Sequence, residues 1–535
     1  MQGRERVDRQ LLDAQALVGH LVPAGSMFAF LAAHRGELFT DEDFADLFPS
    51  GKGRPSVPAS VMASVMVLQV LHDYSDGEAA EAARCDLRWK AACGFPLDHG
   101  GFDPSTLVYW RRRLAKSGRP HRVSDVVRTV IEQTGVLRGR RRRVVDSTIL
   151  ADAVATQDTI TQLVSAVRRV GREVPGAAEK IAAVCTGHDY SQPGKPKIDW
   201  DDPAAKQALV SALVNDANAL VAALAGAELE EGAASAVALL ALVAGQDVEP
   251  AEGSDGTDGR WRIARNVAED RVISVNDPEA RHTRKSPEAR RDGYRAHVAA
   301  DPETGIITDE KLTKAAGTEN SDAAVAAQFV AGEAAAEDAP GPGHDGRDRD
   351  QLTWYGDSAY GTGDLRKAIV TAGHQAVIKP WPLQPAVEGG FTADDFTVDA
   401  AAGTVTCPAG ITRQVTTRNA VIFGVACRSC PLRGRCTTSK HGRTLHLHEH
   451  DSLLRAARAD WAAGPELRQD YMTHRPNVER VIAQVATCRG RRLKLRYRGE
   501  TSNHAWLKRR TAALNLRNLL GRGLARSNGA WVLVT

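Results

Sequence analysis

An aspartate inside an apolar, β-branched segment constrains this chain more than any other feature of its sequence. Asp146 stands within Val144-Val-Asp-Ser-Thr-Ile-Leu150, directly after the basic run of residues 138–143. Such a segment predicts a buried strand, and an unpaired carboxylate inside a buried strand is costly. Asp146 therefore needs a cation or hydrogen-bond donors beside it.

Strands and helices alternate further along the chain. A hairpin is predicted where the turn residues 301–305 separate two β-rich segments, and the elements after it alternate in type. The predicted elements are strands at 294–300 and 305–308, a helix at 321–336, a strand at 352–357, a helix at 364–372 and a strand at 376–379. The alternation predicts an α/β core, a mixed sheet flanked by helices.

Composition and patterning divide the 535 residues into this core and its additions. Ordinary proportions of hydrophobic (43%) and charged (25%) residues exclude a disordered chain. The predicted parts are an all-α N-terminal domain at 1–137, the first part of the core at 138–151 and 291–390, a helical insertion at 152–290, a β-rich Cys/His insertion at 391–459, and the C-terminal helical part of the core at 460–535.

Membrane and nucleotide binding have no support in the sequence. No apolar run is long enough to cross a bilayer, and the N-terminus has no apolar secretion-signal core. No P-loop motif is present, and the Gly-x-Gly-x-x-Gly at 341–346 follows an acidic loop instead of a strand. We therefore expect a cytoplasmic protein with no membrane partner and no nucleotide cofactor.

Two further acids fall in elements that can meet Asp146. Asp357 ends a predicted strand, and Glu479 lies in a C-terminal helix. Carboxylates on two adjacent strands and a covering helix suit a pair of Mg²⁺ or Mn²⁺ ions, which serve phosphoryl transfer. In the alternative, Asp146 caps a turn and Glu479 forms a surface ion pair with Arg475 or Arg480.

An Arg-rich aromatic helix is predicted at residues 105–114. It carries a Tyr-Trp pair followed by Arg111, Arg112 and Arg113. Short helices that end in such a helix are typical of DNA-binding modules, so we assign it to recognition of specific DNA. The alternative is a solvated basic face on a core helix.

Four cysteines gather in the β-rich range. Cys407, Cys427, Cys430 and Cys436 include one Cys-x-x-Cys pair and suit a tetrahedral zinc site. In the alternative they are four free thiols in a small subdomain.

Several motifs, in order along the chain, resemble the DDE transposases of bacterial insertion sequences, in the branch with an InsH-type N-terminal domain. The matching segments are residues 44–48, 55–71 and 105–114 for the N-terminal domain, 145–148 and 292–301 for the first catalytic strands, 355–361 for the second aspartate and 475–482 for the glutamate helix. The resemblance implies an RNase H-like catalytic core in which Asp146, Asp357 and Glu479 hold the metals.

The resemblance also implies the partners and the location. It implies binding to terminal inverted repeats and target DNA, a homodimer in the DNA complex, and a nucleoid-associated bacterial protein. DNA cleavage and strand transfer are the implied activity. A metal-dependent nuclease without strand transfer and a sequence-specific DNA-binding protein are the alternatives.

The C-terminal segment departs from the wider family pattern. Tyr471 stands one residue too far from Arg475, and Ala486 occupies the position where related transposases carry a lysine. Residues 480–526 nevertheless hold 13 Lys and Arg against one acid. We therefore expect phosphate contacts from the basic residues beside the glutamate, namely Arg475, Arg489, Arg491 and Arg492.

Overall fold

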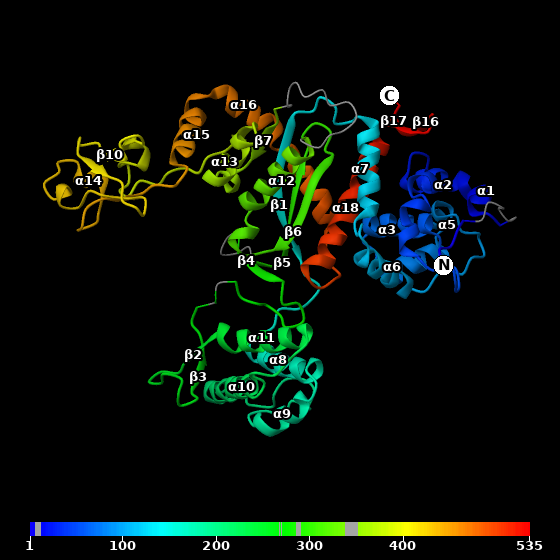
Figure 1. The fold of residues 1–535 in the computed structure, drawn as a ribbon, viewed down its shortest axis with the longest axis horizontal. Helices are drawn as coiled ribbons and strands as arrows, with labels where there is room; N and C mark the ends of the chain where they lie inside the picture. The colour runs from blue at the N-terminus through cyan, green and yellow to red at the C-terminus, as the bar shows by residue number, and fades with distance from the viewer. Residues whose placement is uncertain (6–11, 267, 269, 285–289, 338–350, 535) are drawn as a thin grey trace.

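A computed structural model describes residues 1–5, 12–266, 268, 270–284, 290–337 and 351–534. A mixed sheet lies at the centre, with the N-terminal helices on one side, a helical unit below and a small β-rich unit at the far end (Figure 1). The Gly-x-Gly-x-x-Gly of residues 341–346 lies outside the described ranges.

Six strands form the central sheet, in the order β4-β5-β1-β7-β8 with β6 also paired to β5. β1 runs antiparallel to β5 and parallel to β7, and β7 runs parallel to β8. The strands are β1 (Arg142–Ala151), β4 (Arg281–Arg284), β5 (Arg290–Ala300), β6 (Ile307–Lys314), β7 (Thr353–Gly356) and β8 (Gln375–Ile378). The predicted mixed α/β arrangement is confirmed, and β4 adds a strand from the range that the sequence assigns to the helical insertion.

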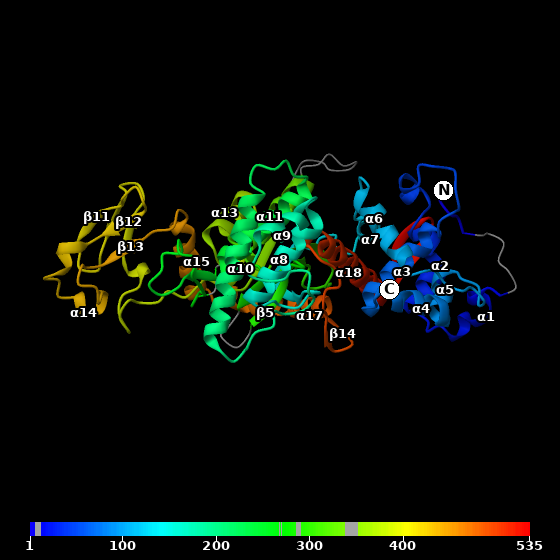
Figure 2. The same cartoon turned by 90° about the horizontal axis from the view of Figure 1, so that it is seen from below.

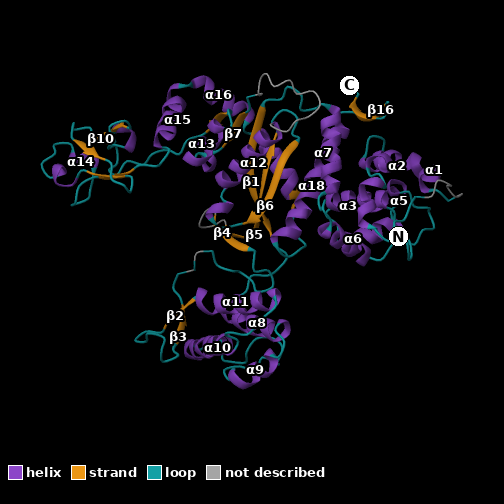
Figure 3. Ribbon diagram, in the orientation of Figure 1, coloured by secondary structure: helices purple, strands orange, loops and turns teal. Residues whose placement is uncertain are grey.

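Helices cover both faces of the sheet, which explains why the segment around Asp146 is continuously apolar. Val144 packs in the cluster that includes α17 (Asn477–Ala486) and α18 (Glu500–Gly521). Its neighbour Val145 packs in the cluster that includes α12 (Asp322–Glu337) and α13 (Gly363–Thr371). Figure 3 shows α12, α13 and α18 beside the strands.

The N-terminal helices share one continuous hydrophobic core with the sheet and α18. Asp86 separates the helices of residues 76–85 and 87–93: its carboxylate accepts a hydrogen bond from the Arg88 N–H (2.8 Å) and caps the second helix. The helices are α1 (Ala14–Val18), α2 (Met27–Leu38), α3 (Ala59–His72), α4 (Asp76–Cys85), α5 (Leu87–Cys93), α6 (Ser105–Lys116) and α7 (Arg122–Thr134).

The inserted unit that follows β1 has a hydrophobic core of its own. Asp158 caps its first helix through the Thr161 N–H (2.8 Å), and the helices then pack on one another. Its elements are α8 (Thr159–Glu173), α9 (Ala177–Val184), α10 (Pro203–Ala223), α11 (Glu231–Gln246), β2 (Val248–Pro250) and β3 (Trp261–Ile263).

The β-rich unit also has a separate small core, built around Phe396 and Phe423. Its elements are β9 (Thr397–Asp399), β10 (Thr404–Thr406), β11 (Thr412–Gln414), β12 (Ala420–Ile422), α14 (Arg433–Cys436) and β13 (Thr444–His446).

Two helices, α15 (Asp451–Ala463) and α16 (Pro465–His474), return the chain to the sheet. The range 460–535, predicted as the helical end of the core, also contains two hairpins. β14 (Thr487–Cys488) and β15 (Arg491–Arg492) form a hairpin there, because Arg489 and Gly490 both adopt positive φ and reverse the chain.

A second hairpin, β16 (Leu524–Ser527) and β17 (Ala530–Leu533), ends the chain. Its Trp531 packs on Phe30 of α2, so the C-terminal hairpin lies against the N-terminal helices (Figure 1). Within the described ranges, none of the helices combines the length and the apolar character that a bilayer crossing requires.

Candidate functional site

The strand register brings Asp146 and Asp357 side by side. β1 and β7 are parallel, and their last register pair is Val144 with Tyr355. Each aspartate follows its strand's member of that pair by two residues. The two carboxylates therefore meet at the end of β7, where Asp357 also caps a short 3₁₀ helix through the Ala359 N–H (2.8 Å).

Arg475 supplies the cation that the sequence requires for Asp146. It directly follows α16 and is 7% exposed. Its Nη2 lies 3.1 Å from Oδ2 of Asp146 and 3.4 Å from Oδ2 of Asp357. One guanidinium nitrogen thus bridges both carboxylates. In this structure Arg475 compensates the negative charges of Asp146 and Asp357. Its contact with a DNA phosphate stays a prediction.

Burial and nearby charges act in opposite directions on Asp146. Burial raises the pKa of its carboxyl group, while the Arg475 guanidinium and the Ser147 N–H, which donates to Oδ1 (2.8 Å), lower it. The Asp357 carboxylate raises it further. Because burial and the neighbouring Asp357 both disfavour the charged form of Asp146, a cation bound beside the two carboxylates would stabilise that form.

Glu479 lies in the first turn of α17, the helix that packs against β1. Val478 and Val481 are buried toward the sheet, while the Glu479 side chain is exposed. Its charge raises the pKa of Tyr471, as do those of Asp357 and Asp146, with burial as the largest cause. Tyr471 therefore lies near all three acids, although the spacing of its motif departs from the family pattern.

The alternative ion pair for Glu479 does not form with Arg475, which binds the two aspartates. Arg480 donates to the Asn477 side chain (3.0 Å). Convergence of the Glu479 carboxylate with the aspartates stays a prediction. Over the described ranges, no three His, Cys, Asp or Glu side chains are arranged to hold a metal ion. Carboxylate oxygens are nevertheless the donors that a hard divalent ion prefers.

Tyr360 is a member of this site that the sequence analysis did not single out. It is 2% exposed, and its hydroxyl has no hydrogen-bond partner in the described structure. The charges of Asp322, Asp146 and Asp357 reinforce burial in raising its pKa. Gly356 makes room for its ring, because a Cβ there would lie 2.8 Å from the Tyr360 Cβ. Tyr360 lies within the 355–361 motif, three residues after Asp357, and this position could have indicated that it belongs to the site.

Two of the three arginines assigned to DNA recognition are engaged within the protein. Arg111 forms a two-nitrogen ion pair with Asp76, one nitrogen at 2.8 Å, and its guanidinium lies 5.0 Å from the Tyr497 ring centroid. Arg113 donates to the Leu47 carbonyl and lies over the Phe48 ring (4.7 Å).

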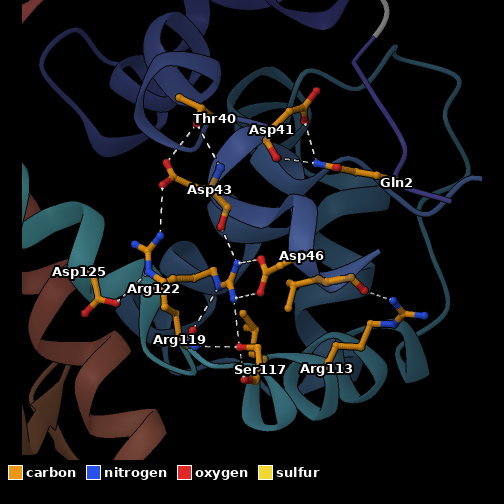
Figure 4. A network of polar contacts seen from close by, with 12 residues as sticks. Gln2, Thr40, Asp41, Asp43, Asp46, Arg113, Ser117, Arg119, Arg122 and Asp125 are labelled. Carbon is orange, nitrogen blue, oxygen red and sulfur yellow. Dashed lines mark hydrogen bonds and ion pairs between the residues drawn. The ribbon is translucent and has the colours of Figure 1, made fainter. Parts of the chain in front are cut away.

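Figure 4 shows Arg113 at the edge of a polar network in which Arg122 binds Asp46 (2.5 and 2.8 Å). The side chain of Arg112 is exposed. Arg111 and Arg113 therefore do not form the solvated face of the alternative, because both are engaged within the protein. DNA recognition by this helix stays a prediction.

The predicted phosphate contacts beside α17 lie at the surface. Arg491 and Arg492 are exposed on β15. Arg489, in the turn before them, places Nη2 3.2 Å from Nδ1 of His72 in α3. The three side chains are free of carboxylate partners in the part of the chain that is described, as phosphate binding requires.

The four cysteines of the β-rich unit line one small cavity of about 20 Å³, together with Phe396 and Phe423. All four are free thiols. Burial raises the pKa of Cys436, and the other three cysteines add to this, against the Arg443 guanidinium. Cys407 thus lines the same cavity as the Cys-x-x-Cys pair. No three of the four thiols are arranged to hold a metal ion in the described structure, so zinc stays a prediction.

Two family models match the chain. The model "Transposase DDE domain" matches residues 406–520, which include the four cysteines, Arg475 and Glu479. The model "Transposase domain (DUF772)" matches residues 18–113, the N-terminal helices as far as Arg113. No curated protein and no solved structure matches the chain, so an RNase H-like core also stays a prediction. These two matches support a DDE transposase of insertion-sequence type.

Proposed function

We propose that this protein cuts DNA at the ends of its own mobile element and joins those ends to target DNA. The observation that carries the proposal is the meeting of Asp146 and Asp357 on Arg475, beside the helix of Glu479. Acids from two strands and a helix, followed by a basic segment, suit a reaction on a phosphodiester.

The chemistry has two balanced steps. A water oxygen attacks phosphorus at the element end, the P–O3′ bond breaks, and the departing oxygen takes a proton to become a free 3′-OH. That 3′-OH then attacks a target phosphorus, a new P–O3′ bond forms, and the target's own 3′ oxygen leaves. No external energy source is needed, because one phosphodiester replaces another.

Asp146, Asp357 and Glu479 would hold Mg²⁺ or Mn²⁺, which supplies activation of a hydroxyl and stabilisation of a leaving oxygen. The chain's own contribution is to position the two aspartates by strand register and to place the Arg475 guanidinium against both carboxylates. Arg489, Arg491 and Arg492 draw in and orient DNA phosphates without reading sequence. A homodimer on paired ends is part of the proposal.

The test is an assay with duplexes that carry the DNA flanking the gene, supplied with Mg²⁺ and a target plasmid. The wild-type protein should cleave the end and form joined product. Asp146→Asn, Asp357→Asn and Glu479→Gln should each lose both products while they still bind the duplex. Cleavage without joining would favour a nuclease, and binding without cleavage a DNA-binding protein. Full activity of Glu479→Gln would remove the glutamate from the site.

A further inference from the structure

A cavity of about 460 Å³ lies between the N-terminal helices and the C-terminal segment, away from the acid site. Its walls come from the start of α2, the end of α3, the end of α17 with the following hairpin, and α18. Figure 2 shows α17, β14 and α18 next to one another on the side that faces these helices. The side chains that matter for the argument are His72, Gln484, Arg489, Arg510 and Arg517.

Three arginines of this cavity have no carboxylate partner among the described residues. Arg489 contacts His72 (3.2 Å), and Arg517 donates weakly to Oε1 of Gln484 (3.4 Å). Arg510 is 2% exposed and donates to the backbone carbonyls of Val70, Gln484 and Thr487 (2.7 Å to each of the last two). Its buried Nε has no partner.

The nearest acids are already committed elsewhere. Asp73 pairs with Arg496 (3.5 Å), and Asp86 pairs with Arg88 (2.6 Å). His72 adds no compensation: burial first, and then Arg489, lowers its pKa to about 4, so the ring is neutral near pH 7. The cavity therefore carries an excess of positive charge that the described structure leaves uncompensated.

One of the arginines that line the cavity, Arg489, has an unfavourable backbone conformation. Arg489 adopts φ +49°, a conformation that residues other than Gly, Asn and Asp rarely take. Arg guanidinium groups bind phosphate oxygens through paired hydrogen bonds. A surplus of arginines around a cavity of this size suits a phosphate that belongs to a larger molecule.

The position of the cavity relates it to the acid site. Glu479 lies at the first turn of α17, and Gln484 lies near its other end. The helix has 10 residues, which corresponds to about 15 Å. Since duplex DNA rises about 3.4 Å per base pair, that length covers about four to five base pairs.

We propose that this cavity binds one backbone phosphate of DNA, within about five base pairs of the bond that the acid site acts on, with Arg489 and Arg517 as its ligands. Arg510 adds charge from the cavity wall. The inference rests on the proposed function, and it adds a contact made jointly by the N-terminal helices and the core.

The test uses the full chain and an end duplex in which single phosphates are replaced by neutral methylphosphonates. The variant is Arg489→Asn with Arg517→Ala, since Asn tolerates the positive φ. Its matched control is Arg413→Ala with Arg418→Ala, two exposed arginines of the β-rich unit. If the double variant unfolds at a different temperature from the control, the Arg517→Ala single variant is used in its place.

For the wild type, one methylphosphonate near the cleavage point should weaken binding about tenfold or more. The double variant should be insensitive at that position, and its log–log salt slope should be lower by about 0.9. A variant that keeps the wild-type slope and the wild-type methylphosphonate profile would overturn the inference. So would stabilisation of the wild type alone by inorganic phosphate with no change in DNA binding, which would indicate a small-phosphate site. A wild-type protein that binds no end duplex would instead refute the proposed function.

Discussion

Nη2 of Arg475 lies 3.1 Å from Oδ2 of Asp146, and the same nitrogen reaches Asp357. A residue of the C-terminal segment thus neutralises two acids of the central sheet. The contact connects the last part of the chain to the first strand of the core, and it leads to a direct test of how the acids are held.

Replacing Arg475 by Gln should destabilise the protein by about 2 kcal/mol, because Asp146 is left largely buried without its counter-ion. If the acids bind a divalent ion, Mg²⁺ should restore part of the loss, and it should stabilise the variant more than the wild type. Urea unfolding with and without Mg²⁺ measures both effects. Arg480→Gln, at an exposed position of α17, is the control. If Arg475→Gln and Arg480→Gln were equally stable, the folded protein would not need Arg475 to compensate the charge of Asp146 and Asp357.

The ion pair of Arg111 with Asp76 predicts a structural role for the first arginine of α6. Arg111→Ala should cost about 1–3 kcal/mol, whereas Arg112→Ala, at an exposed position, should stay within about 0.5 kcal/mol of the wild type. A double-mutant cycle with Asp76→Ala should give a coupling energy above about 0.5 kcal/mol.

The same variants separate folding from DNA recognition. Loss of preference for element ends in Arg112→Ala, with unchanged stability, would support base or phosphate contact by α6. Zero coupling between positions 76 and 111 would contradict the structural role of the pair.

The four cysteines around one cavity predict one zinc ion per chain. Cys427→Ser with Cys430→Ser should lose that metal, since zinc sites in proteins use four ligands. Elemental analysis of the purified protein measures it. Cys85→Ser, at an exposed cysteine of α4 outside the cavity, should keep the full content. Metal-free wild-type protein, or undiminished zinc in the double variant, would leave four free thiols as the correct interpretation.

Because the pKa of Asp309 in β6 is raised, we expect the free energy of unfolding to depend on pH. Burial, Glu310 and Glu333 together raise its pKa to about 7, against Arg128 and Lys508. Between its ordinary pKa of about 4 and about 7, the folded state keeps a proton that the unfolded state has released. This carboxyl group therefore lowers stability progressively as pH rises through that window.

Asp309→Asn removes this titrating carboxyl group. The variant should therefore become progressively more stable relative to the wild type as the pH rises from 4 to 8. Chemical unfolding at several pH values measures the difference. Asp201→Asn, at an exposed position of the inserted unit, should show no such trend. A difference between Asp309→Asn and wild type that stays constant with pH would contradict the raised pKa.

Local sequence determined the elements of the core. The β-branched run around Asp146 became β1, the turn residues at 301–305 formed the hairpin between β5 and β6, and the helix at 321–336 is α12 within one residue at each end. Such patterns depend on neighbours in the chain, so they can be interpreted without the fold. The hairpin at 487–492 escaped prediction because it depends on the positive φ of Arg489, which propensity does not reveal.

The sequence alone also established that Asp146 needs a cation, because burial of a carboxylate is costly wherever it occurs. Only the tertiary structure decided that Arg475 supplies this cation and that Arg111 pairs with Asp76. It also decided that Arg489 and Arg517 line one cavity, which has no acid among its described lining residues. An arginine's partner is set by which helices pack together, and residues distant in sequence become neighbours only in the folded chain. Charge composition therefore predicted a basic segment, while the fold determined which of its charges remain available to a phosphate.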